Sequence, residues 1–69
     1  MTLREFREIL KWSIPELARR AGLDVQTARR AEDGEPIQGR TAQSIAEALS
    51  RGMGRDIQVK DIDGLNVRI

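Results

Sequence analysis

The stretch from residue 13 to residue 34 constrains the fold most, because it contains start and stop signals for two short helices in immediate succession. Ser13 and Glu16 have the spacing of a capping box, which marks a helix start. Gly22 can end this helix in the left-handed conformation, and Asp24 can cap the next one. The sequence therefore predicts a helix over residues 14–21, a tight turn, and a second helix over residues 25–33.

The second helix of this pair has one small apolar side and one longer, mostly polar side. At about 100° per residue, the inner side holds Ala28 and Ala31, with Thr27 close to them. The opposite side carries Val25, Gln26, Arg29, Arg30 and Asp33. A helix of about three turns that presents Gln and Arg fits a DNA major groove, since Gln can pair with adenine and Arg with guanine. The pattern predicts a recognition helix for double-stranded DNA.

Several motifs that occur in register resemble one family of DNA-binding proteins. They are LREFR, WSIPELARRAGLDVQTARRAEDGEP and TAQSIAEAL, and the resemblance that they carry covers residues 2–50. Together they resemble the phage repressor and Cro type of helix-turn-helix, also called the xenobiotic-response-element or lambda-repressor-like family. The resemblance implies a mainly α fold of four helices that binds an operator. It also implies an internal ion pair between Arg7 and Glu32, and a loop after the recognition helix that lies along the DNA backbone.

Two further helices complete the expected core. Thr2 can cap a helix over residues 3–11, and Trp12 is read as a core residue at its end. Residues 34–40 contain two glycines and a proline, which predict a loop. The fourth helix is expected to begin at Arg40 or Thr41 and to end at Leu49 or Ser50, because two glycines in the following RGMGR segment are read as a break. The helix-turn-helix domain is thus expected over residues 1–54.

The tail of the same domain, residues 55–69, allows two structures. A β-hairpin with its loop at residues 62–64 pairs position 59 with 67 and position 57 with 69, so that apolar residues share one face. The alternative is a short fifth helix over residues 59–65, with which the family usually ends. The hairpin is favoured slightly. Either form leaves apolar side chains uncovered, which predicts a dimerisation surface of Ile57, Val59, Val67 and Ile69.

The expected DNA contacts come from the recognition helix, from the helix start before it and from the end of the loop after it. They are Ser13, Val25, Gln26, Thr27, Arg29, Arg30 and Arg40. Ser13 is included because helix N-termini attract anions, and Arg40 because it can reach a phosphate. The charge distribution agrees, since residues 19–30 carry +3 whereas residues 56–69 carry −1, in a chain of net charge +1.

Composition excludes several classes of site. The chain has no cysteine and no histidine, which rules out disulfides, Cys/His zinc sites and histidine-based catalysis. No base, nucleophile and orienting group stand together, and the glycine-rich RGMGRD lacks the lysine of a phosphate loop. A protein that is not an enzyme, with no cofactor or metal, is expected. A cytoplasmic location is also expected, because no apolar run is long enough for a membrane span and no signal segment is evident.

Three functions remain open at this point. The favoured one is a transcriptional regulator that represses by occupying an operator as a homodimer. The second is the antitoxin of a toxin-antitoxin pair, in which the tail would hold a protein partner. The third is a protein-interaction module without DNA binding. The low net charge favours this alternative. Ile14 and Asp33 also favour it, because they stand at positions where the family commonly has polar, uncharged residues.

Overall fold

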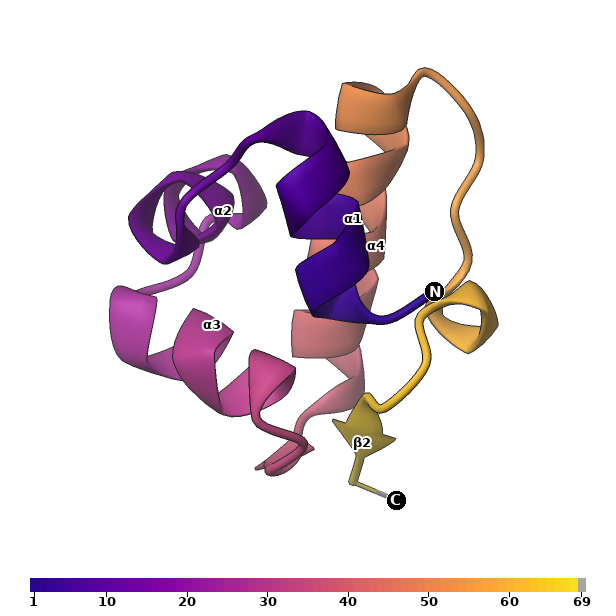
Figure 1. The fold of residues 1–69 in the computed structure, drawn as a ribbon. Helices are drawn as coiled ribbons and strands as arrows, with labels where there is room; N and C mark the ends of the chain where they lie inside the picture. Colours follow the sequence, from indigo (N-terminus) through magenta and orange to yellow (C-terminus); the bar gives the residue numbers. More distant parts are fainter. Residues whose placement is uncertain (69) are drawn as a thin grey trace.

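The computed structural model describes residues 1–68 as four α-helices and one small parallel strand pair. The elements in chain order are α1 (Leu3–Leu10), α2 (Ile14–Ala21), α3 (Val25–Glu32), β1 (Pro36–Ile37), α4 (Gly39–Met53), the 3-10 turn η1 (Val59–Asp61) and β2 (Asn66–Val67). Helix α2 packs against both α3 and α4, and α1 lies across α4 (Figure 1). The predicted mainly α fold of four helices is confirmed. No helix in the described part of the chain is both long and apolar enough to cross a membrane.

Each of the first three helices begins at a side chain that accepts a hydrogen bond from the backbone N–H three residues later. These side chains, with their distances, are Thr2 at 3.1 Å, Ser13 at 3.2 Å and Asp24 at 2.8 Å. Gly22 ends α2 with a φ of 71°, as predicted. The capping box at α2 is only half formed, because the Glu16 carboxylate accepts from Arg19 and from Arg20, whose Nε lies 2.6 Å away, rather than from the cap backbone.

The core is built from all four helices and from the tail. Its largest fully buried side chains are Phe6, Leu17, Ile45 and Leu49. Helix α3 contributes Ala28 and Ala31, whose exposed fractions are 0% and 1%. Because both side chains are small, the backbone of α3 lies close to the elements that support it.

Helix α4 continues to Met53, beyond the predicted end at Leu49 or Ser50. Gly52 therefore lies within the helix, and reading it as a break is wrong. A Cβ atom at Gly52 would lie 2.7 Å from two ring atoms of Trp12 and 3.1 Å from the Leu10 side chain. Glycine at this position lets the last turn of α4 pass directly against Trp12, which packs on the core as predicted.

We expect Gly52→Ala to lower the free energy of unfolding by about 1–2 kcal/mol, because the cost of overpacking against Trp12 exceeds the gain in helix propensity. Gly39→Ala is the matched control in the same helix, since its added Cβ meets only one atom, at 4.0 Å. Urea denaturation followed by circular dichroism measures both variants. Equal stability of the two variants would contradict the tight contact at Gly52.

The tail forms neither of the two predicted structures. The hairpin is wrong, because β2 pairs in parallel with β1, with Pro36 opposite Asn66 and Ile37 opposite Val67. The expected fifth helix is reduced to the single turn η1. The physical reason is burial: Ile57 and Ile62 each insert into the core, with exposed fractions of 2% and 4%. A hairpin would have left its apolar face without a cover.

Hydrogen bonds hold the tail along its whole path. The Ser50 hydroxyl accepts from the Ile57 N–H at 2.8 Å, and the Asp63 N–H donates to the Met1 carbonyl at 2.7 Å. The Arg68 N–H then donates to the Ile37 carbonyl at 2.7 Å. The tail thus runs from the end of α4, past the start of α1, to the loop that follows α3 (Figure 1). Ile69 lies outside the described residues.

Candidate nucleic-acid interface

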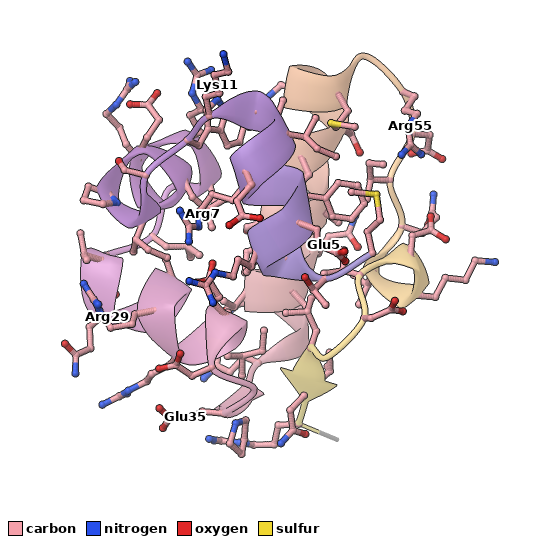
Figure 2. All side chains as sticks on the ribbon, in the orientation of Figure 1. Glu5, Arg7, Lys11, Arg29, Glu35 and Arg55 are labelled. Atoms are coloured by element: carbon pink, nitrogen blue, oxygen red, sulfur yellow. The ribbon has the colours of Figure 1, made fainter. Side chains whose placement is uncertain are left out.

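Helix α3 presents its predicted outer side chains to solvent. Gln26, Arg29 and Arg30 are exposed, and the exposed fraction of Val25 is 38%. Figure 2 shows Arg29 pointing away from the body of the molecule. Thr27 is half-buried, between the outer and inner sides. The helix therefore offers polar donors on a face that the domain itself does not cover.

An ion pair fixes the C-terminal end of α3 to α1. Arg7 Nε lies 2.8 Å from Glu32 Oε1, and Arg7 Nη2 lies 3.1 Å from Glu32 Oε2. The third guanidinium nitrogen, Nη1, donates to the Trp12 carbonyl at 3.0 Å. Only 17% of each of the paired side chains is exposed, and Figure 2 shows Arg7 among the helices. The hydrogen bond to Glu32 raises the pKa of Arg7. The pair implied by the family resemblance is present.

The arginines divide into two groups according to whether a carboxylate of the domain neutralises them. Those with a carboxylate within 4.0 Å are Arg4, Arg7, Arg19 and Arg20. Within the described residues, the arginines of α3, of the start of α4 and of the tail end have no such partner; these are Arg29, Arg30, Arg40 and Arg68. Arg51 and Arg55, at the other end of α4, also lack one there. Unpaired positive charge is thus available next to the recognition helix.

Two carboxylates near this surface have lowered pKa values. The pKa of Asp24 is lowered mainly by hydrogen bonds from Thr27, and the positive charge of Arg30 lowers it further. The pKa of Glu16 is lowered mainly by the hydrogen bond from Arg20. Both groups therefore stay ionised to a lower pH than an ordinary carboxylate of their type. At the N-terminus of α3 the Asp24 charge also interacts favourably with the helix dipole.

Ser13 and Arg40 flank the recognition helix as the last residue before α2 and the second residue of α4. Both are exposed. The Ser13 oxygen accepts the capping hydrogen bond, which leaves its hydroxyl hydrogen available to donate. Arg40 Nε donates to the Gln38 side-chain oxygen at 2.8 Å, while the rest of its guanidinium makes no hydrogen bond to another described residue. That either residue contacts a phosphate stays a prediction.

A groove of about 280 Å³ opens beside α3. Its lining residues come from α3, β1, the start of α4 and the tail, and they are Thr27, Arg30, Pro36, Ile37, Gln38, Thr41 and Arg68. Two of them, Thr27 and Arg30, are among the predicted DNA contacts. Thr41 lies next to Arg40 in sequence, and Arg40 was predicted to contact DNA. The sequence gives no indication that Arg68 lies here, because its position depends on the pairing of β2 with a strand far away in the chain.

The residues predicted for dimerisation lie in different environments. Ile57 is buried in the core of its own domain, so the premise that it is spare apolar surface is wrong. Val59 and Val67 are partly buried and pack against the same core. Ile69 lies outside the described residues. The antitoxin alternative, in which the tail holds a toxin, stays a prediction.

Comparison with known proteins gives one match. The family model described as Helix-turn-helix matches residues 3–54, about three quarters of the chain, from the start of α1 to the end of α4. No curated protein and no solved structure matches the chain. The tail, with Ile57 and Arg68, lies outside the matched residues.

Proposed function

The chain belongs to the lambda-repressor-like helix-turn-helix family, and from this premise we propose that it is a sequence-specific regulator that represses transcription by occupying an operator in double-stranded DNA. One observation carries the proposal. Helix α3 combines buried Ala28 and Ala31 on its inner side with exposed Gln26 and Arg30 on its outer side. A rigidly supported helix with such donors is suited to reading base edges in the major groove.

The side chains of the proposed interface have two kinds of role. Gln26 and Arg30 would read base edges, because Arg30 can donate two hydrogen bonds to guanine, and Gln26 can donate one to adenine N7 while its oxygen accepts one from the adenine N6 amino group. Ser13 and Arg40 would contact phosphates, which fix the register of the domain on the duplex but carry no sequence information. An operator occupied in this way is closed to RNA polymerase.

The proposal includes a homodimer. One helix-turn-helix reads only about half of a typical operator, and two copies about 34 Å apart read both halves. Because Ile57 is committed to the core, Val59 and Val67 are the tail residues among the described ones that stay candidates for the interface. Sedimentation with and without operator DNA tests this part, and a chain that stays monomeric on its operator would refute it.

We expect Gln26→Ala or Arg30→Ala to weaken binding to the preferred site by about 1–3 kcal/mol and to relax base preference at one position. Arg40→Ala should instead weaken all sequences alike and lower the salt slope by about one unit. Selection of bound fragments from a random library identifies the site, and titrations at several salt concentrations follow. Arg55→Ala, which removes one charge beyond the far end of α4, is the control and should change neither property (Figure 2).

The same measurements separate the regulator from a protein-interaction module. A module that binds only proteins would show no salt-dependent affinity for random duplex. If Gln26→Ala and Arg30→Ala both left specific binding unchanged, α3 would not be the reading element.

A further inference from the structure

Two arginines from distant parts of the chain line the groove beside α3. Arg30 belongs to the recognition helix, and Arg68 follows β2. Neither has a carboxylate within 4.0 Å among the described residues. The same groove exposes the polar side chains of Thr27, Gln38 and Thr41. The lining therefore offers two guanidinium groups that no carboxylate of the described residues contacts within 4.0 Å, together with hydroxyl and amide donors.

Backbone contacts hold Arg68 at this groove. Its N–H donates to the Ile37 carbonyl at 2.7 Å, and Asn66 donates from its side chain to the Gly34 carbonyl at 3.3 Å. A Cβ atom at Gly39 would lie 4.0 Å from the Val67 side chain, so the tail also touches the first turn of α4. The backbone that carries Arg68 is thus attached to the loop after α3 and lies against α4.

The chemistry of the groove suits a phosphate group. Guanidinium groups bind phosphate oxygens through pairs of parallel hydrogen bonds, and hydroxyl groups add further donors. The groove shares Thr27 and Arg30 with the recognition helix. When α3 lies in a major groove, residues on its flank come next to the phosphates of the strand that borders that groove. A phosphodiester of the duplex is therefore the occupant that the position favours.

We propose that this groove binds one phosphate of the DNA backbone and that Arg68 neutralises it, next to Arg30, which remains a base-reading residue of the recognition helix. The inference rests on the proposed function, and it deepens that function by making the C-terminal tail part of the DNA-binding surface. It assigns a DNA contact to Arg68, which lies outside the residues that the family model matches.

The test compares Arg68→Ala, Arg68→Lys and Arg55→Ala in the full chain, with random-sequence duplex as the probe. Arg55 is a matched control, because it is also an exposed tail arginine without a carboxylate partner among residues 1–68, and Figure 2 shows it on the side of the molecule away from α3. We expect Arg68→Ala to lower the slope of log affinity against log salt by about one unit. Arg68→Lys should keep most of the slope, because a lysine still neutralises a phosphate. Arg55→Ala should keep all of it.

Circular dichroism and thermal unfolding first establish that the three variants are folded, which is expected because the Arg68 contact to Ile37 uses the backbone. A wild-type slope in Arg68→Ala, with weakened binding in Arg30→Ala, would overturn this inference and leave the proposed function standing. Equal losses in Arg68→Ala and Arg55→Ala would also overturn it, as a general charge effect. Wild-type protein that binds no duplex would overturn both.

A final arm distinguishes DNA from a free phosphate compound as the occupant. Inorganic phosphate is added to the wild-type complex, and chloride at equal ionic strength serves as the reference. Release of DNA by phosphate at concentrations where chloride has no effect supports the inference, because phosphate and DNA then compete for the same groove. Binding of inorganic phosphate that is lost in Arg68→Ala, while Arg68→Ala keeps the wild-type salt slope for duplex, would reassign the groove to a free phosphate ligand and overturn the inference.

Discussion

Replacing Ile57 by alanine is expected to lower the free energy of unfolding by about 2–5 kcal/mol, the range for truncating a buried isoleucine. The residue is 2% exposed and packs in the core, although it lies in the tail, outside the residues that the family model matches. Its N–H also donates to the Ser50 hydroxyl at 2.8 Å, which fixes the position of the side chain. Urea denaturation followed by Trp12 fluorescence and by circular dichroism measures the loss.

Val59→Ala is the control for this prediction, since Val59 lies in the same segment but is only partly buried. Val59→Ala should lower the free energy of unfolding clearly less than Ile57→Ala does. An Ile57→Ala variant within about 0.5 kcal/mol of the wild type, the range of ordinary surface changes, would show that the tail adds nothing to the core.

Glu32→Ala should lower the free energy of unfolding by about 3 kcal/mol, because it leaves the Arg7 charge partly buried and without its carboxylate. The value is at the lower end of the range for buried pairs, since 17% of each side chain is exposed. The exposed pair of Arg4 and Glu8 on α1 is the matched control, with side chains 69% and 65% exposed. Glu8→Ala should cost no more than about 0.5 kcal/mol.

A double-mutant cycle isolates the interaction. Replacing Arg7 by Met and Glu32 by Leu together should cost less than Glu32→Ala alone, because no unpaired charge remains buried. Chemical denaturation of the wild type, Arg7→Met, Glu32→Leu and the double variant gives the coupling energy. If Glu32→Ala cost no more than Glu8→Ala, the pair would be an ordinary surface contact.

The first three helices could be predicted from the sequence because their limits are set by local chemistry. Thr2, Ser13 and Asp24 each cap a helix through a bond that spans only three residues. Gly22 ends α2 in the left-handed conformation that glycine tolerates best. The outward face of α3 followed from helical periodicity alone. The pair of Arg7 and Glu32 could not be found from spacing, since 25 residues separate its members, and it came only from the resemblance.

The remaining features depend on contacts between distant segments. Gly52 could be a helix break or a close approach, and only the position of the Trp12 ring decides between them. The alternation of apolar residues in the tail fits a hairpin, but it does not reveal that the core has places for Ile57 and Ile62. The same holds for Arg68. Its place beside Arg30 follows from the parallel pairing of residues 36–37 with residues 66–67, which leaves no trace in the local sequence.

The two alanines on the inner side of α3 have a consequence for how binding preference can change over time. Ala28 and Ala31 make the inward contacts, while the exposed positions 26, 29 and 30 contribute little to the core. Under the proposed function, substitutions at the outer positions would therefore alter the preferred operator without lowering the stability of the domain. A larger side chain at position 28 or 31 would instead displace the whole helix. New operator preferences would then be accessible by single outward substitutions, to evolution and to a designer alike.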